Sequence, residues 1–81
     1  MIVTVQFVAM LKDETGTERC AVQLPEGASV QDVRRSLLEV YRTLREHLDY
    51  CRVAVNREYS SWEARLQEGD EVCLIPPVSG G

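Results

Sequence analysis

The decisive stretch reads Glu71-Val72-Cys73-Leu74-Ile75-Pro76-Pro77-Val78-Ser79-Gly80-Gly81 and closes the 81-residue sequence. Its first five residues alternate between two faces, which is the pattern of a half-buried β-strand. Proline fixes φ and has no N–H to donate to a sheet, so Pro76 and Pro77 should end this strand and begin a stiff, extended segment. We therefore predict a folded domain over residues 1–75 and a tail over residues 76–81.

The tail ends on Gly80 and Gly81, which have no Cβ and accept almost any φ and ψ. Such an end is thin enough to enter a narrow channel on another protein, with the terminal carboxylate leading. The tail can reach roughly 20 Å, at about 3.3–3.6 Å per residue. The inserted segment would comprise Pro76, Pro77, Val78, Ser79 and Gly80 ahead of Gly81. The alternative is a frayed terminus without a role, which is what most chain ends are.

Three further stretches carry the alternation or the β-branched residues of strands, over residues 2–9, 18–24 and 50–56. In the first of them, Val3, Val5 and Phe7 share one face. Residues 10–17 are polar and contain a glycine, so we expect a loop that joins the first two strands as a hairpin. Residues 57–59 can form a short return strand after a turn at Asn56.

A helix is expected directly after Ser29, because Asp32 three residues later completes a variant of the capping box. Apolar residues then recur at spacings of three and four: Val30, Val33, Leu37, Val40, Tyr41 and Leu44. No glycine or proline marks the end of this helix. Residues 42–49 could therefore continue it, kink it or form a separate short turn.

This order of elements places one main helix across one face of a mixed sheet. Packing the apolar faces of the first and last strands against the helix puts both strands in the middle of the sheet. The layout is that of an α+β, ubiquitin-like β-grasp fold. The tail would then leave from the most rigid part of the domain, which favours an arm that is aimed over a frayed end.

Composition excludes several classes of ligand. The net charge is −4 and the sequence pI is near 4.9, which argues against nucleic acid and against an anionic membrane surface. It suits a partner with a basic surface, although a mild negative charge also simply keeps a small protein soluble. No apolar run is long enough to span a bilayer, and the alternating N-terminus is unlike a signal peptide. We expect a cytoplasmic protein.

The three cysteines, Cys20, Cys51 and Cys73, are odd in number and widely spaced. This favours reduced thiols that act as small hydrophobic side chains over a disulfide scaffold. The single histidine, His47, lies in a polar stretch, so we expect no metal site and no bound cofactor.

Several segments together resemble the MoaD family, the small subunits of molybdopterin synthase, within the MoaD/ThiS ubiquitin-like sulfur carriers. They are Met1 to Phe7, Gly16-Thr17, Leu24-Pro25-Glu26-Gly27, Val53-Ala54-Val55-Asn56, Gly69-Asp70-Glu71-Val72 and Ile75 to Gly81. The most specific part is Gly-Asp-Glu-Val followed by the Pro-Pro-Val-Ser-Gly-Gly terminus. Thiamine sulfur carriers of the ThiS type share the fold and the terminal Gly-Gly but usually lack the Pro-Pro-Val lead-in.

The resemblance implies a sulfur carrier in molybdenum cofactor biosynthesis. In that family a ubiquitin-activating-like enzyme, MoeB in bacteria, uses ATP to adenylylate the C-terminal glycine, here Gly81. A sulfurtransferase system converts it to a thiocarboxylate, a 1-thioglycine. The tail enters the large subunit MoaE, and sulfur passes to cyclic pyranopterin monophosphate. The carrier then supplies sulfur and is not catalytic on its own.

Val8 and Ile75 should face away from the helix, beside the root of the tail. Contiguous exposed apolar surface usually marks an interaction site, so we predict a docking patch for the large subunit. Two isolated exposed aliphatic residues are the alternative. Lys12 and Arg57 are candidates for ion pairs at its rim.

Two other functions stay open. The chain could be a sulfur carrier for thiamine synthesis or tRNA thiolation, or a ubiquitin-related modifier. It could also be a β-grasp interaction module with a passive tail.

Overall fold

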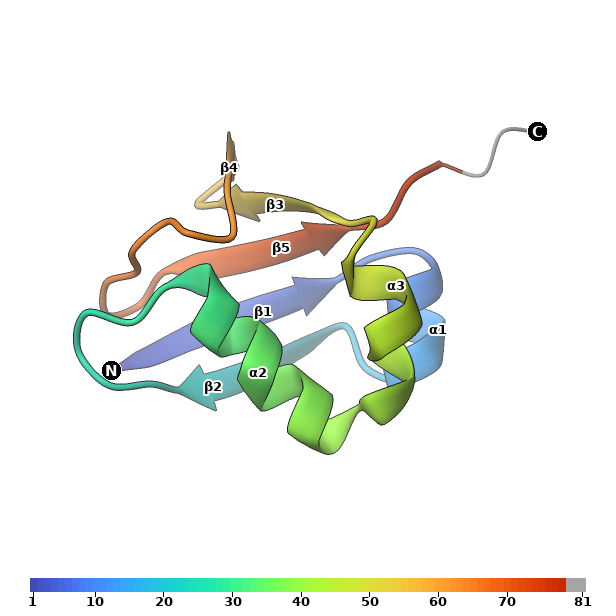
Figure 1. Cartoon of the computed structure of the whole chain (residues 1–81), viewed down its shortest axis with the longest axis horizontal. Coiled ribbons are helices and arrows are strands. Elements are labelled where there is room, and N and C mark those ends of the chain that lie inside the picture. The colour runs from blue at the N-terminus through green and yellow to red at the C-terminus, as the bar shows by residue number, and fades with distance from the viewer. Residues whose placement is uncertain (79–81) are drawn as a thin grey trace.

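The computed structural model describes residues 1–78. Five strands, three α-helices and a 3₁₀ helix follow one another within this range (Figure 1). In chain order they are β1 (Ile2–Phe7), α1 (Met10–Thr15), β2 (Arg19–Gln23), α2 (Val30–Val40), η1 (Arg42–Leu44), α3 (Arg45–Leu48), β3 (Arg52–Val55), β4 (Glu58–Ser60) and β5 (Glu71–Ile75).

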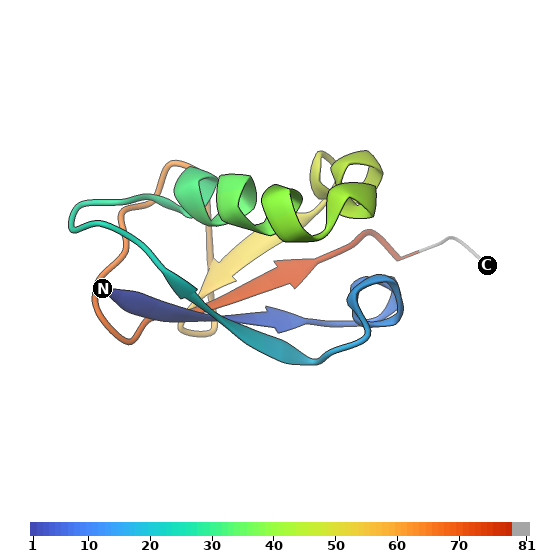
Figure 2. The ribbon, with the colours of Figure 1, turned by 90° about the horizontal axis from the view of Figure 1, so that it is seen from below.

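The strands form one mixed sheet in the order β2-β1-β5-β3-β4. β1 and β5 pair in parallel, with Val5 opposite Val72, while the other neighbours are antiparallel. Helix α2 crosses one face of this sheet (Figure 2). The predicted β-grasp layout is therefore confirmed, including the placement of the first and last strands inside the sheet.

The core lies between α2 and the sheet. Its fully buried side chains come from β1, β5, α2 and the short helices: Val3, Val5, Phe7, Leu11, Val30, Val33, Leu44, Leu48, Val72 and Leu74. Burial of such side chains contributes about 1.5–3 kcal/mol each, which is the main stabilisation available to a chain of this size. Within residues 1–78, the helices are too short and too polar to cross a bilayer.

Helix α2 begins where the sequence predicts. The backbone N–H of Ser29 donates to Asp32 Oδ2 at 2.9 Å, and the reciprocal half of the capping box is also present. The prediction that Val40 lies on the buried stripe is wrong, because that side chain is 71% exposed. The helix ends there, since Tyr41 leaves helical geometry at φ −118° and ψ 78°. Leu44 consequently reaches the core from η1.

The predicted loop over residues 10–17 is also corrected, because most of it forms α1. Leu11 is fully buried and anchors this helix to the core. The hydroxyl of Thr15 donates to the Leu11 carbonyl at 2.9 Å, and Gly16 ends the helix in the left-handed conformation at φ 75°. A helix of six residues is too short to show a clear apolar period, so burial of Leu11 decides its formation.

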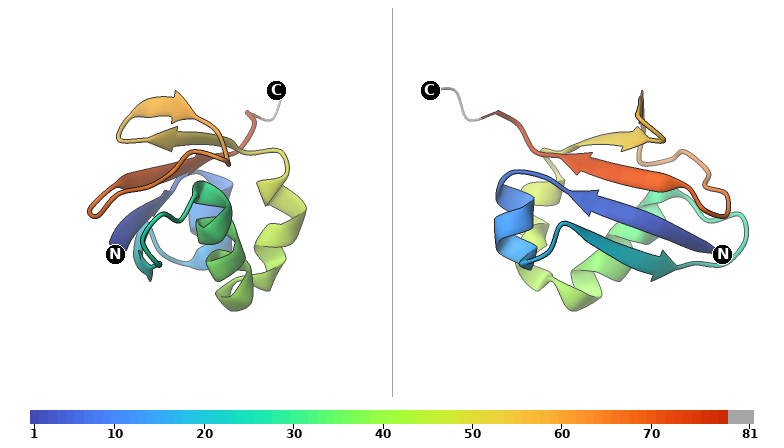
Figure 3. Two further views of the ribbon diagram at one scale, coloured as in Figure 1. Left: turned by 60° about the vertical axis from the view of Figure 1, so that its left-hand side comes forward. Right: turned by 180° about the vertical axis from the view of Figure 1, so that it is seen from behind.

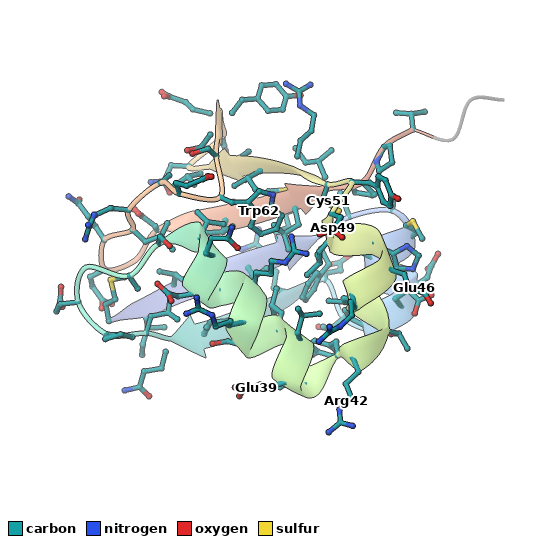
Figure 4. All side chains as sticks on the ribbon, in the orientation of Figure 1. Glu39, Arg42, Glu46, Asp49, Cys51 and Trp62 are labelled. Atoms are coloured by element: carbon teal, nitrogen blue, oxygen red, sulfur yellow. The ribbon has the colours of Figure 1, made fainter. Side chains whose placement is uncertain are left out.

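Arg34 joins α2 to the loop regions beside it. Its guanidinium pairs with Asp49 at the end of α3 and lies 5.1 Å from the centre of the Trp62 ring. Figure 4 shows Asp49 and Cys51 together where α3 gives way to β3, with Trp62 near the start of α2. Trp62 packs on the edge of the core, as the sequence predicts.

Candidate functional site

The described part of the tail leaves the sheet from its middle. β5 lies between β1 and β3, and its last residue, Ile75, sits opposite Arg52. Pro76 is buried against the domain, whereas Pro77 is exposed and Val78 is 93% exposed. The free part of the arm therefore begins one residue later than the first proline. The chain leaves the domain at the end of the sheet where α1 and α3 also lie (Figures 1 and 3).

An apolar groove of about 440 Å³ lies beside the root of the tail. Its walls are Val8, Ala9, Met10, Ile75, Pro76, Pro77 and Val78. The structure thus brings Val8 and Ile75 together, as predicted, and their role in docking stays a prediction. Ala9 and Met10 were missed because the alternating pattern places Ala9 at the end of the first strand, which in the structure ends at Phe7, and Met10 reads as the start of a polar loop. The adjacent apolar pair Met10-Leu11 was the available signal.

Ala9, one of the residues in the wall of this groove, has a strained backbone conformation. Its φ of 51° and ψ of −128° are unusual for a residue with a Cβ and cost of order 1–3 kcal/mol. The N–H groups of Leu11 and Lys12 donate to the carbonyls of Val8 and Ala9, both at 3.1 Å, and hold the turn closed. The sharp turn from β1 into α1 is what places Met10 next to the tail.

A second depression, of about 460 Å³, lies on the sheet face opposite α2. The right-hand view of Figure 3 shows that α2 does not cover this face. Small side chains, Ala54 and Cys73, form its floor. Its rim is formed by Gln6, Arg19, Arg57, Tyr59, Glu71 and Ile75. Two arginines, Arg19 and Arg57, and one glutamate, Glu71, stand on this rim, whereas the chain as a whole carries −4. No local sequence pattern indicates this feature, because it arises only when the outward positions of all five strands lie side by side.

Ion and aromatic contacts fix that rim. The guanidinium of Arg52 lies 4.0 Å from the centre of the Tyr59 ring, and Arg19 Nη1 is 3.8 Å from Glu71 Oε2. Ile75 borders both this depression and the groove of the tail. The two concavities therefore form one continuous surface around the last residue of β5.

The β3–β4 turn aims Arg57 at the depression. Asn56 and Arg57 both have positive φ, at 51° and 71°, as a two-residue hairpin turn of type I′ requires. The side chain of Asn56 donates to Asp70 Oδ1 and accepts from the N–H of Glu71, both at 2.9 Å. Arg57 as a rim partner stays a prediction. Lys12 already has an internal partner, Glu18.

The thiols of the chain are poor nucleophiles. Burial raises the pKa of Cys20, and it raises the pKa of Cys51 against a smaller opposing effect of Arg34. Burial and the charge of Glu71 both raise the pKa of Cys73. All three are therefore protonated at neutral pH and suited to packing more than to carrying sulfur.

Within the described part of the chain, no three His, Cys, Asp or Glu side chains group as metal ligands would.

Three predicted site residues, Ser79, Gly80 and Gly81, lie outside the described residues. The structure thus defines the root of the arm and the surface around it.

Comparison with known proteins then decides the family. The ThiS family model matches residues 5–81, nearly the whole sequence, including the tail. The chain belongs to the ThiS family. The family resemblance inferred from the sequence motifs is thereby confirmed.

Several relatives of this ThiS-family chain share one name. It is 30% identical to the molybdopterin synthase sulfur carrier subunit of Chlamydomonas reinhardtii, over 100% of both chains. It is 38% identical to the protein of that name from Mycobacterium tuberculosis, over 85% of this chain and 81% of the relative.

Solved structures agree with the fold. The putative molybdopterin converting factor subunit 1 of Pyrococcus furiosus superposes with a TM-score of 0.87 at 30% identity, covering 96% of this chain and 99% of that one. SAMP1 of Haloferax volcanii gives a TM-score of 0.91 at 26% identity over 100% of both chains. A protein–protein complex of subunits 1 and 2 of the molybdopterin-converting factor of Helicobacter pylori gives 0.72 at 28% identity, also over 100% of both chains.

Proposed function

We propose that this chain is the sulfur carrier subunit of a molybdopterin synthase. The observation that carries the proposal is the full-length similarity to relatives of that name, which spans both the domain and the tail. The arrangement at the root of the tail supports it. An arm that leaves from a central strand, past a buried proline, has a fixed origin and direction from which its end can reach into a partner.

The chemistry requires activation of the Gly81 carboxyl group. A terminal carboxylate has a pKa of roughly 3.3–3.7, so it is ionised at neutral pH and resists nucleophilic attack. Attack of a carboxylate oxygen on the α-phosphorus of ATP releases pyrophosphate and gives an acyl-adenylate. Hydrosulfide, as the sulfur donor, then attacks the acyl carbon, the bond from that carbon to the AMP oxygen breaks, and the resulting thioacid loses its proton to give a thiocarboxylate. A ubiquitin-activating-like adenylyltransferase of the MoeB type would perform the first step.

The thiocarboxylate would be the modification that the carrier delivers. Its sulfur is a better nucleophile than the oxygen it replaces, and glycine offers no side chain to hinder approach to the pterin precursor. Two carriers, each with a C-terminal thiocarboxylate, would supply the two sulfurs of the dithiolene formed from cyclic pyranopterin monophosphate. The catalytic side chains of that step would belong to the partner.

The partner would be the large subunit of the synthase, of the MoaE type. The solved complex of subunits 1 and 2 from Helicobacter pylori supports this assignment. Here the tail groove offers apolar contacts through Val8, Met10 and Ile75, and the adjoining sheet face offers Arg57 for ion pairs. These residues would bind first and set the entry angle of the tail. The reduced thiols fit a cytoplasmic protein.

A second candidate function is favoured by one specific observation. SAMP1, a small archaeal modifier protein, aligns with the whole chain at a TM-score of 0.91. A modifier would use the same activated Gly81 but transfer the acyl group to amines of other proteins. The two functions share the adenylate and differ in the nucleophile that consumes it.

The deciding experiment is a reconstitution. Purified chain, adenylyltransferase, ATP and a sulfur donor are incubated, and the product is then mixed with the large subunit and the pterin precursor. We expect exchange of one carboxyl oxygen for sulfur, followed by accumulation of molybdopterin. Absence of sulfur exchange would overturn the carrier function. Sulfur exchange without molybdopterin would assign the chain to another sulfur pathway.

A further inference from the structure

We infer that Lys12 is the one side-chain amine at which a second, activated copy of this chain can be attached, and that Glu18 suppresses this attachment. The inference rests on the proposed activation of Gly81. It concerns a risk inherent in that function, because an acyl-adenylate reacts with amines as well as with sulfur.

The sequence itself limits the acceptors. Of nine basic residues eight are arginine, and Lys12 is the single lysine. An arginine guanidinium stays protonated in proteins and has no free lone pair for acyl transfer. Nearly all positive side chains of the chain, including Arg19 and Arg57 on the open sheet face, are therefore groups that cannot act as nucleophiles in acyl transfer.

The structure directs Lys12 away from its own tail. Met10 lines the tail groove and Leu11 is fully buried. Lys12 follows Met10 by two positions, a rotation of about 200° at 3.6 residues per turn. Its Nζ lies 2.8 Å from Glu18 Oε1, just before β2 on the other side of β1. Lys12 is therefore not among the residues that line the tail groove, and its amine lies beside the start of β2.

Glu18 is well placed to hold this amine. The N–H of Phe7 donates to the Glu18 carbonyl at 2.8 Å, which fixes the backbone of Glu18 beside the end of β1. The hydrogen bond from Lys12 and the charge of Glu18 raise the pKa of the amine, and Asp13 adds a smaller effect. The pair is exposed, so the effect is modest, but it acts on the single lysine present.

The attachment would follow ordinary acyl transfer. The Lys12 Nζ lone pair attacks the acyl carbon of the adenylate and forms an amide bond. The bond from that carbon to the AMP oxygen breaks, AMP leaves, and the amine proton passes to solvent. Only the neutral amine reacts, because the ammonium form has no lone pair. Glu18 stabilises the ammonium form, so it lowers the rate and leaves more adenylate for sulfur.

The first test is independent of the proposed function. The folded chain is treated at neutral pH with a limiting amount of an acetyl N-hydroxysuccinimide ester, and the initial rate of Lys12 acetylation is measured by peptide mass spectrometry. Glu18→Gln should raise this rate about two- to fivefold, the range expected for an exposed ion pair. The control is Glu14→Gln, because Glu14 lies on the same helix but faces His47 at 3.7 Å. Equal rates in wild type and Glu18→Gln would overturn the role of Glu18.

The second test uses the adenylyltransferase and ATP without a sulfur donor. Covalent dimers are counted by intact mass, and their linkage is located by peptide mapping. Glu18→Gln should increase dimers linked through Lys12, and Lys12→Arg should abolish them, while mapping separates any linkage through the Met1 amine. Dimers linked through another side chain, or unchanged in Lys12→Arg, would overturn the inference. Pyrophosphate release is followed in parallel, and its absence would refute the proposed function while the acetylation test still decides on Glu18.

Discussion

Replacement of Ile75 by aspartate should separate docking from folding. Ile75 is half-buried, ends β5 and borders both concavities at the root of the tail. We expect Ile75→Asp to weaken binding of the large subunit by at least about 100-fold, because an ion moved into a dry interface carries a penalty of several kcal/mol. Ile75→Ala should weaken binding of the large subunit less than Ile75→Asp does. Full burial of isoleucine contributes about 1.5–3 kcal/mol. Because Ile75 is already half-buried in the free domain, binding adds only about half of this, so the Kd of Ile75→Ala should rise about fivefold.

The fold should tolerate the aspartate. Arg52 lies directly opposite position 75 on β3, and an opposite-charge pair across strands contributes about 0.2–1 kcal/mol. The Tm should therefore fall by no more than about 4–8 °C, the shift that corresponds to about 1 kcal/mol in a domain of this size. Ile2→Ala is the control for Ile75→Ala, because it removes the same side chain from the opposite end of the sheet, where Ile2 is 49% exposed.

Isothermal titration calorimetry of each variant with the large subunit gives the affinities, and thermal unfolding gives the stabilities. Unchanged affinity of Ile75→Asp with an unchanged Tm would refute the docking role of the groove. Equal losses of affinity in Ile75→Ala and Ile2→Ala would refute its localisation to the root of the tail.

Three further predictions concern the scaffold. Leu11→Ala should lower the free energy of unfolding by about 2–5 kcal/mol in chemical denaturation, since Leu11 is fully buried, and a loss below about 1 kcal/mol would show that α1 is not anchored there. Ser29→Ala should cost about 0.5–2 kcal/mol through loss of the half of the capping box that the Ser29 side chain makes, whereas an unchanged denaturation midpoint would contradict that cap. Because burial raises the pKa of Cys20, Cys51 and Cys73, less thiolate is present at any given pH than in free cysteine. Iodoacetamide should therefore alkylate the folded chain slowly at neutral pH and faster as the pH rises, and alkylation at the rate of free cysteine would contradict this.

The parts of the fold that local patterns determine could be predicted from the sequence. Alternation located the strands, and the capping box of Ser29 located the start of α2. The end of α2 could not be read, because neither glycine nor proline is present. Tyr41 ends the helix through tertiary packing, with its ring edge-to-face on Phe7 at 5.8 Å between centroids.

The same distinction applies to the site. The meeting of Val8 and Ile75 follows from the parallel pairing of β1 with β5, in which Phe7 lies opposite Leu74. The contribution of Met10 could not be predicted, because it depends on α1 and on the strained turn at Ala9. The cationic rim around Arg57 depends on strand order and on a hairpin turn held by Asn56, and neither is encoded in a local pattern.

Transfer of sulfur to Gly81 is tested most directly by the intact mass of the chain after incubation with an adenylyltransferase, ATP and a sulfur donor, with fragmentation to locate the change. We expect the mass to rise by the difference between sulfur and oxygen, the change to map to Gly81, and a chain lacking Gly81 to show no change. An unchanged mass, or sulfur found on Cys20, Cys51 or Cys73, would contradict it.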